Sequence, residues 1–299
     1  MIREREHRMA EIPSPQTTGP GNEPPLYAQE SGLSLFLKLF IVPAAIVLVA
    51  LGIFLLGSLA LHNPKSAEQY LRELKSDSTS RRWQSAFELS RLVAQGEKIQ
   101  FDAGLRDQLI QTFEESQKDD PRVREYLALV LGHLKERKAV PALSKAVHDE
   151  SVDVRVYSLW ALGNIEDPSG GAAALEALSD PDLGVRRMAV GALSSLRYGP
   201  AKFALEKNLE DPAHPALRYD SALALARLKD DKAVPALLEM TGLKASGKPE
   251  DEIIQSAKLA AIEGYKELKD GRLKEQIQSL SKNDPDLKVR EAALEALKK

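Results

Sequence analysis

The chain has 299 residues, no cysteine and a formal net charge of −3, from 41 basic and 44 acidic side chains. The absence of cysteine excludes disulfides, thiol catalysis, cysteine-type zinc sites and iron–sulfur clusters. Because the charge is nearly balanced, it argues against nucleic acid as a partner. Aromatic residues make up only 5% of the chain, and alanine and leucine dominate its C-terminal part, a composition that favours helix over sheet.

Residues 1–32 form a tail rich in proline. Its five prolines are Pro13, Pro15, Pro20, Pro24 and Pro25. Gly19, Gly21 and polar residues stand between them, so the segment has too little apolar surface to fold. We therefore predict that residues 1–32 are disordered.

An uncharged run, LFIVPAAIVLVALGIFLLGSLAL, occupies residues 39–61. At about 1.5 Å per residue a helix of this length reaches roughly 34 Å, enough to cross a hydrocarbon core of about 30 Å. We predict one transmembrane helix over residues 33–62, with Lys38 and Lys65 at the two interfaces. A cleaved signal peptide is the alternative, and the length of the run and its distance from Met1 argue against it. A buried core helix would need a cover on all sides, which no neighbouring segment supplies.

The basic residues on the two sides of this run bear on its orientation. Those on the N-terminal side are Arg3, Arg5, Arg8 and Lys38. Those on the C-terminal side are Lys65, Arg72, Lys75, Arg81 and Arg82. The larger number of basic residues on the C-terminal side slightly favours a cytoplasmic C-terminal part. That orientation, however, would require the charged N-terminal tail to cross the membrane without a signal peptide, which argues for a cytoplasmic N-terminus. We expect the helix to lie in a bacterial inner membrane. A chain without cysteine is compatible with either side of that membrane, so the absence of cysteine does not decide the topology. We favour a cytoplasmic N-terminus with the C-terminal part outside.

A phrase that begins with aspartate recurs in the C-terminal part. It reads DPRVREYLALVLGHL at residues 120–134 and DPDLGVRRMAVGALSSL at residues 180–196. Its arginines, Arg124, Arg155, Arg186 and Arg218, follow one another at intervals of 31, 31 and 32 residues. That period is typical of a two-helix repeat. The aspartate suits an N-cap and the proline after it suits the first turn, so each phrase predicts the second helix of a pair.

Apolar residues recur at fixed offsets from these anchor arginines. The seventh residue after each anchor is leucine, namely Leu131, Leu162, Leu193 and Leu225. The positions four, seven and ten residues after the anchor lie on one helix face. Weaker copies begin at Arg82 and Arg290, and in a further copy Gln255 replaces the arginine. We predict an all-α solenoid of about seven helix pairs over residues 63–299.

The pattern D-P-x-V-R followed by A-x-x-A-L-G-x-L resembles the HEAT-like repeats first named for phycobilisome lyases. The likeness extends over residues 63–299 and is most specific in the middle four repeats. It implies a right-handed solenoid of stacked antiparallel helix pairs, and protein-binding scaffolds are the usual function of such arrays. Some relatives are bilin lyases or bilin isomerases, and a distinct group comprises DNA glycosylases.

In arrays of this kind, recurring aspartate and arginine side chains form ladders between neighbouring repeats. We assign this structural role, and no catalytic one, to the anchor positions. They are Asp120, Arg124, Arg155, Asp180, Arg186, Asp211, Arg218, Asp284 and Arg290.

The positions two, five and nine residues after each anchor lie roughly opposite the core face. Polar residues are expected on a solvated helix face, yet several of these positions are large and apolar. They are Phe87, Tyr126, Leu129, Tyr157, Trp160 and Met188. Half-exposed aromatic residues are typical interface anchors. We infer a concave groove, centred on Tyr126, Tyr157 and Trp160, that grips a peptide or a neighbouring membrane subunit. The alternative is that they pack sideways, with Trp160 opposite Gly191.

Motifs for chemistry are missing. The histidines are His7, His62, His133, His148 and His214, and no two have the i, i+4 spacing of a helical metal site. There is no glycine-rich phosphate loop and no G-x-S-x-G elbow. A glycosylase needs a basic groove, and the groove positions are mostly neutral. We therefore predict no cofactor, no metal and no enzymatic activity.

Three functions follow from these patterns. The leading hypothesis is a single-pass membrane protein whose solenoid is a docking scaffold for a protein partner, a subunit of a membrane complex or its regulator. The second is a bilin lyase-like or other tetrapyrrole-handling enzyme, against which the anchor argues because lyases of this group are usually soluble. The third is a passive structural spacer, against which the aromatic positions argue.

Overall fold

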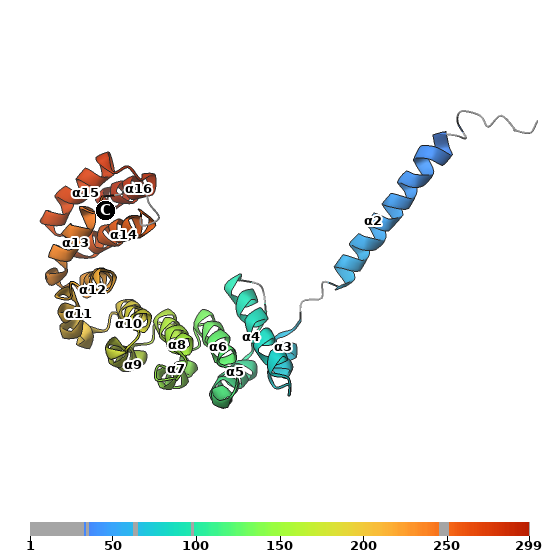
Figure 1. Cartoon of the computed structure of the whole chain (residues 1–299), viewed down its shortest axis with the longest axis horizontal. Coiled ribbons are helices and arrows are strands. Elements are labelled where there is room, and N and C mark those ends of the chain that lie inside the picture. The colour runs from blue at the N-terminus through green and yellow to red at the C-terminus, as the bar shows by residue number, and fades with distance from the viewer. Residues whose placement is uncertain (1–32, 34–35, 62–64, 97–98, 245–250, 299) are drawn as a thin grey trace, which may run out of the picture. The chain divides into compact units, whose positions relative to one another are not determined.

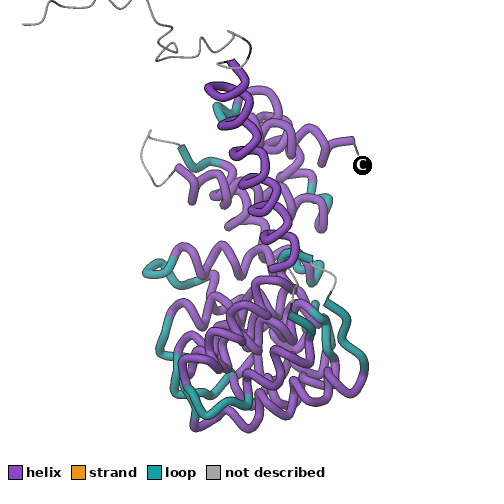
Figure 2. Tube along the Cα trace, turned by 90° about the vertical axis from the view of Figure 1, so that its right-hand side faces the viewer, coloured by secondary structure: helices purple, strands orange, loops and turns teal. Residues whose placement is uncertain are grey.

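The computed structural model describes residues 33, 36–61, 65–96, 99–244 and 251–298. The predicted disordered tail, residues 1–32, lies outside the described residues. Contacts divide the chain into two compact units, Met1–Pro64 and Lys65–Lys299. Every regular element in the described residues is helical, which confirms the all-α prediction. Figure 2 shows this as purple throughout, with loops in teal.

The first unit contains one long apolar helix. A π-helical turn, η1 (Leu37–Ile41), continues into α2 (Val42–Leu61). Over Leu37–Leu56 this helix is long and apolar enough to cross a membrane, by length and composition, and none of that window is buried within the protein. It is the sole helix in the described part of the chain with these properties.

Within its described residues the second unit contains seven helix pairs, which confirms the predicted number. Its first helices are α3 (Ala67–Leu74), α5 (Ala103–Glu115), α7 (Val140–Ala146), α9 (Gly171–Glu176), α11 (Lys202–Leu209), α13 (Val234–Thr241) and α15 (Gly271–Asn283). Its second helices are α4 (Thr79–Ala94), α6 (Pro121–His133), α8 (Val152–Ile165), α10 (Leu183–Ser195), α12 (Pro215–Arg227), α14 (Asp251–Leu268) and α16 (Leu287–Lys298). Short 3-10 helices, among them η2 (Ser116–Lys118), connect several of these.

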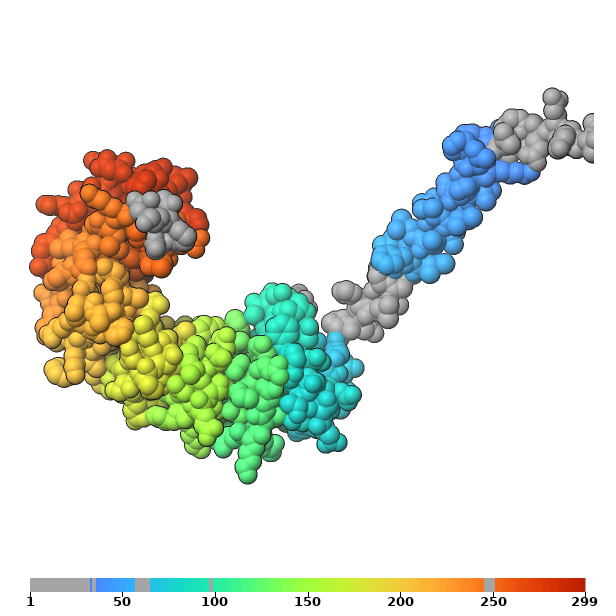
Figure 3. All heavy atoms as spheres, viewed as in Figure 1, coloured from blue at the N-terminus to red at the C-terminus, as the bar shows by residue number. Residues whose placement is uncertain are grey.

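The helices of this unit form two layers. Each second helix packs against the second helix of the next pair, from α4 through α16, and Figure 1 shows this layer on the inner side of the unit's curve. The first helices lie on the outer side. In Figure 3 the side chains of the yellow and orange repeats leave the inner side hollowed. The second helices therefore provide the concave face of the unit.

The core lies between the two layers and between successive pairs. The leucines predicted seven residues after each anchor are all buried, and so are the residues four after it, Ala128, Leu159, Val190 and Ala222. Because these offsets share one helix face, one column of side chains runs through the stack. Each pair thus buries its apolar face only against its neighbours, as expected of a solenoid.

The predicted helix caps are right at one aspartate and wrong at three. Asp120 caps α6 by accepting a hydrogen bond from the N–H of Arg122. Asp180, Asp211 and Asp284 instead accept from the N–H two residues later, within the turn that precedes the helix. In two of these copies a second aspartate takes the cap, as Asp182 does for α10. The turn leaves the second carboxylate oxygen of the first aspartate free for another partner.

Second helices α6 to α14 end on residues in the left-handed region that are not glycine. These residues are Lys135, Glu166, Arg197, Lys229 and Lys269, with φ between 47° and 59°. The first four stand eleven residues after the anchor arginines. Lys269 stands eleven residues after Lys258, which makes Lys258 the anchor of the sixth pair. The left-handed residue is the C-terminal cap that reverses the chain into the next pair.

Candidate functional site

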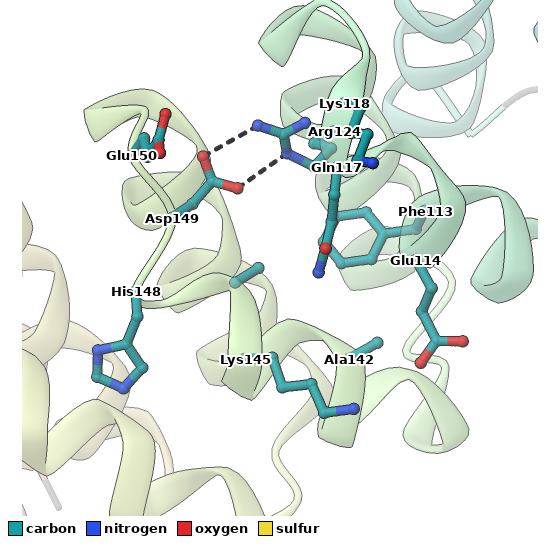
Figure 4. Close-up of a pocket in the computed structure, with 11 residues that line it drawn as sticks. Phe113, Glu114, Gln117, Lys118, Arg124, Ala142, Lys145, His148, Asp149 and Glu150 are labelled. Carbon is teal, nitrogen blue, oxygen red and sulfur yellow. Dashed lines mark hydrogen bonds and ion pairs between the residues drawn. The ribbon is translucent and has the colours of Figure 1, made fainter.

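The anchor arginines join neighbouring repeats through buried ion pairs. On α6, the Arg124 guanidinium donates to the backbone oxygen of Ser116 at 2.6 Å and to Oδ1 of Asp149 at 3.0 Å. Its Nε lies 2.9 Å from Oδ2 of the same aspartate, and Arg124 is only 6% exposed. Arg124 thus ties the turn before its own helix to the turn before α8. Figure 4 shows this fork at the edge of a pocket of about 640 Å³.

The same fork recurs one repeat later and one repeat earlier. Arg155 donates to the backbone oxygen of Asp149 at 2.9 Å and places its Nε 2.8 Å from Oδ2 of Asp180. Arg82 donates to the backbone oxygen of Ser76 and to Oδ1 of Asp119 at 2.6 Å. These contacts join pairs one to four into one stack. Planar guanidinium groups suit this double role because their donors point in two directions.

Other members of the predicted ladder have different partners. Arg186 and Arg290 bond to backbone oxygens in the turns before their own helices. Asp120 pairs with Arg122 on the same helix at 2.6 Å. Asp211 pairs with His214, and Arg218 pairs with Glu239 on α13. Of the predicted set, the structure brings together across repeats only Arg155 and Asp180 as a pair.

The sixth pair corrects one assignment and adds a residue. Lys258 donates to Oδ2 of Asp284 at 2.6 Å, and both residues are almost completely buried. Gln255, taken from sequence as the anchor position, lies three residues earlier and bonds instead to Asp286. Lys258 was not predicted because an arginine was expected at the anchor position. Asp149 was not predicted because no proline follows it. Asp119 was not predicted because the neighbouring Asp120 is the aspartate that precedes a proline.

The residues predicted to bind a partner lie on four neighbouring second helices, α4, α6, α8 and α10. The Phe87 ring is 40% exposed and meets the Tyr126 ring edge to face, with centroids 5.2 Å apart. Tyr126, Tyr157, Leu129, Met188 and Trp160 are half-buried. The structure thus brings Phe87 and Tyr126 together and keeps part of each predicted side chain accessible.

Trp160 packs towards the preceding repeat. Its indole lies 4.8 Å from the His133 ring, and an added Cβ on Gly132 would meet its Cζ3 at 2.7 Å. The alternative placement opposite Gly191 does not occur, because nothing lies within 4 Å of the position of a Cβ on Gly191. Burial beside Trp160 also lowers the pKa of His133, since it penalises the charged imidazole.

The open space at Gly191 belongs to a concave pocket of about 440 Å³ between α10 and α12. Met188, Val190 and Leu223 supply apolar surface to its lining. The ion pair between Arg187 and Asp220, at 2.7 Å, borders it. The pocket therefore combines an apolar floor with a charged rim, and it lies next to the predicted groove residue Met188.

Two carboxylates, Glu125 and Asp153, lie on the same second helices as Tyr126 and Tyr157. Burial, followed by the negative charges of Asp153 and Asp120, raises the pKa of Glu125 on α6. Burial and the charges of Asp153 and Glu125 likewise raise the pKa of Tyr157 on α8. Glu125 lies on α6, and Asp153 and Tyr157 lie on the neighbouring helix α8.

Within the described residues, no group of three or more histidine, aspartate or glutamate side chains is arranged to hold a metal ion. His148 lies 3.1 Å from Glu176 at an exposed position, and His214 lies 2.8 Å from Asp211. The pocket beside Arg124 is lined by side chains of both signs, including Lys118, Lys145 and Glu114. None of the predicted partner-binding residues lines it.

Comparison with known proteins identifies the repeats. A model of HEAT repeats matches residues 107–178, 146–225 and 171–257. No curated protein matches the sequence. The complex of CpcE and CpcF of phycocyanin lyase from Nostoc sp. PCC7120 has a similar fold, with 17% identity over 79% of this chain and 96% of that chain and a TM-score of 0.53. At this identity the likeness shows the fold alone.

Two further solved structures are more distant in shape. YibA of E. coli is 17% identical over 78% of this chain and 92% of its own, with a TM-score of 0.48. Human deoxyhypusine hydroxylase in complex with glycerol is 18% identical over 78% and 94%, with a TM-score of 0.33. The matched HEAT segments together cover more than half of the sequence, and the described helices form the stacked pairs of such repeats, so the chain belongs to the HEAT-repeat family.

Proposed function

We propose that this chain is a scaffold that binds a protein partner through the concave face of its second helices. The observation that carries the proposal is the row of partly exposed aromatic side chains on that face, Phe87, Tyr126, Tyr157 and Trp160. Aromatic side chains bring a large apolar area to an interface at a low cost in conformational entropy, which makes them frequent binding hot spots.

The pocket at Gly191 supports the same proposal. Its volume of about 440 Å³ can receive one or two side chains of a partner, and its apolar floor favours aliphatic or aromatic ones. Its position beside Met188 extends the aromatic row along the concave face towards α12. We propose that the row and the pocket form one continuous groove, the concave groove, from Phe87 to Leu223.

We further propose that the N-terminal helix anchors the scaffold in a membrane. In this proposal residues 1–32 are a tail, residues 33–62 cross the bilayer with an apolar core at 39–61, and residues 63–299 are the solenoid. The exposed apolar surface of η1 and α2 supports this, because hydrocarbon covers such surface without any protein partner. The partner is then a subunit of a membrane complex, and the solenoid lies outside a bacterial inner membrane with the tail in the cytoplasm.

The chain's lack of cysteine provides a direct test of this topology. Single cysteines replace Ser14 in the tail or the exposed Glu210 in the solenoid, and intact cells are labelled with a membrane-impermeant maleimide. The proposed topology predicts labelling at position 210 and none at position 14 until the membrane is permeabilised. The reverse pattern would invert the orientation, and equal labelling at both positions would contradict a membrane-spanning helix.

The scaffold is tested by purification of the full chain in mild detergent and identification of the proteins that come with it. Gly191→Trp adds a large side chain where an added Cβ meets nothing within 4 Å, and Tyr157→Ala/Trp160→Ala removes two aromatic side chains of the groove. Phe203→Ala is the control, since Phe203 is 80% exposed on the outer helix α11. We expect one partner to be lost in both groove variants and kept in the control.

Other outcomes would favour the other functions. A partner retained by every folded variant would move the contact to the anchor, the tail or the outer face. If no partner comes with the wild type, co-expression with a bilin acceptor protein separates the remaining two. A coloured acceptor would support a lyase-like enzyme, and a colourless one would leave the spacer.

A further inference from the structure

Basic side chains gather in a pocket of about 490 Å³ on the first helix pair, which we call the first-pair pocket. It is lined by α3, by the turn after α3 and by the first turn of α4. Its charged lining residues are Lys65, Arg72, Lys75 and Arg81, with Glu73 and Asp77. Lys65 holds Glu73 in an ion pair at 2.7 Å, whereas Arg72, Lys75 and Arg81 form no ion pair with the described residues. Three cations therefore remain beside one further carboxylate.

Two other pockets of the solenoid have a different charge balance. The pocket beside Arg124 sets three carboxylates against Lys118, Arg124 and Lys145. The pocket beside Lys258 is lined by three aspartates. An excess of basic side chains without carboxylate partners thus distinguishes the first-pair pocket from these two.

Arg81 stands where a cation is unfavourable within the fold itself. It is the third residue of α4, whose N-terminal end carries the partial positive charge of the helix dipole, and no acidic residue occupies that first turn. Arg72 and Lys75 have a local explanation, because they lie at the C-terminal end of α3, where cations complement the dipole. Arg81 has none, so an anion in the pocket would relieve both its charge and the free N–H groups of α4.

The first-pair pocket is tied by a short piece of chain to the helix that we propose to cross the membrane. That helix ends at Leu61, and Lys65, four residues later, already lines the pocket. Four residues of extended chain span at most about 14 Å. The polar headgroup region on each side of the hydrocarbon core is itself about 5–8 Å thick. The tether therefore keeps the first pair close to the lipid headgroups.

We propose that the first-pair pocket binds the phosphate of an anionic phospholipid headgroup. Three cations and the N-terminal end of α4 complement a phosphate that no group of its own lipid neutralises. A zwitterionic lipid carries an ammonium group beside its phosphate, which the same cations repel. A neighbouring pocket shares Lys65 and Arg81 and adds the half-buried Trp83, a residue type that favours the membrane interface.

This inference rests on the proposed membrane anchor and names the lipid chemistry beside it. A lipid bound in the first-pair pocket would hold the first helix pair against the bilayer surface. Because the seven pairs pack in sequence on one another, it would also restrict the directions in which the concave groove can face. The solenoid would then be oriented on the membrane as well as tethered to it.

The test measures how close α4 comes to lipid headgroups when the full chain is in nanodiscs. Ser80→Cys supplies a single thiol for a bimane label at an exposed residue of α4 that lines neither pocket. The nanodiscs contain phosphatidylcholine, with or without phosphatidylglycerol, and a trace of lipid whose headgroup carries a nitroxide that quenches bimane at short range.

Two triple variants are compared in these nanodiscs. Arg72→Gln/Lys75→Gln/Arg81→Gln removes the three cations of the pocket, and all three side chains are exposed, so the fold should be kept. Lys274→Gln/Lys282→Gln/Lys288→Gln is the matched control, because it removes the same charge from exposed positions of the last helix pair.

We expect phosphatidylglycerol to raise the quenching at position 80 at least about twofold in the wild type and in the control, and to leave it unchanged in the pocket variant. Equal quenching in both kinds of nanodisc, or an effect of phosphatidylglycerol that persists in the pocket variant, would overturn the inference and leave the anchor intact. Loss of the effect in the control as well would also overturn it, since charge elsewhere on the solenoid would then matter equally. If the chain does not co-elute with nanodiscs of either composition, the proposed anchor fails and the inference fails with it.

Discussion

The middle and the C-terminal repeats of the solenoid are joined by the same kind of contact built from different residues. In the middle, Arg124 and Arg155 each place two nitrogens on the aspartate before the next second helix. In the sixth pair Lys258 takes that position and donates from its single ammonium to Asp284. A guanidinium reaches two turns at once, whereas an ammonium serves chiefly one carboxylate. Both regions thus place a buried cation on the aspartate before the next second helix, with a different residue type in each.

The C-terminal contact gives the largest expected effect. Lys258→Met leaves the Asp284 carboxylate buried without its cation, which we expect to cost about 3–5 kcal/mol of unfolding free energy. Urea unfolding followed by circular dichroism measures the loss. Lys232→Met is the control, because it breaks an exposed ion pair with Glu206 of the same 2.6 Å length and should cost less than about 1 kcal/mol. Adding Asp284→Asn to Lys258→Met should recover part of the loss. Equal losses in variant and control would contradict a cation requirement.

Two glycines sharpen the comparison inside the middle repeats. An added Cβ on Gly132 would meet the Cα of Ala161 at 2.9 Å, so backbone must move, whereas the same atom on Gly191 meets nothing within 4 Å. We expect Gly132→Ala to lower the unfolding free energy by about 1–3 kcal/mol through overpacking. Gly191→Ala should raise it by up to about 1 kcal/mol through helix propensity. Thermal unfolding of both variants decides the point, and a stabilising Gly132→Ala would refute the close approach of α6 and α8.

Glu267 joins repeats that are further apart in sequence. Its carboxylate accepts hydrogen bonds from Arg197 at 2.7 Å and from Lys229 at 2.6 Å. These hydrogen bonds, that of Arg197 first, lower the pKa of Glu267 to about 2. A lowered carboxyl pKa adds stability above the ordinary value of 4.5, and this stability is lost as the pH falls towards 2. After a discount for the exposed partners, we expect about 1–2 kcal/mol. Glu267→Gln should lower stability at pH 7 and flatten its pH dependence between about 4.5 and 2, measured by urea unfolding; parallel curves would contradict this.

Much of the solenoid could be predicted from the sequence because its signals are local. The leucines seven residues after each anchor repeat at a helical period within a single helix, and Leu131 and Leu193 are buried as expected. The assignment of the aromatic residues to the second helices followed from the same period. These features depend only on which residues share one face of a helix, and the spacing of residues in the sequence determines that directly.

The partners of the ladder could not be predicted in the same way. Arg124 binds Asp149, twenty-five residues later, and that choice depends on how one pair stacks on the next. The copy that contains Lys258 was placed three residues out of register because a loop lengthens the interval after Arg218 to 40 residues. The direction in which Trp160 packs could not be predicted either, because it depends on how the pairs stack: its ring lies next to Gly132 and not opposite Gly191.

The left-handed residues that end the second helices test whether the middle and the C-terminal repeats share one backbone conformation, and they have the smallest expected effect. Glu166 closes a middle pair and Lys269 closes the sixth, both with positive φ near 60°. Alanine pays a steric cost in this region that glycine does not, so Glu166→Gly and Lys269→Gly should each be more stable than the corresponding alanine variant by about 1 kcal/mol. Thermal unfolding of the four variants measures the two differences. At each position the glycine and alanine variants lack the same charged side chain, so their difference in stability reports the backbone conformation. Equal differences at Glu166 and Lys269 would show that both regions end their second helices alike. A difference only at Glu166 would show that the sixth pair ends its second helix in another way.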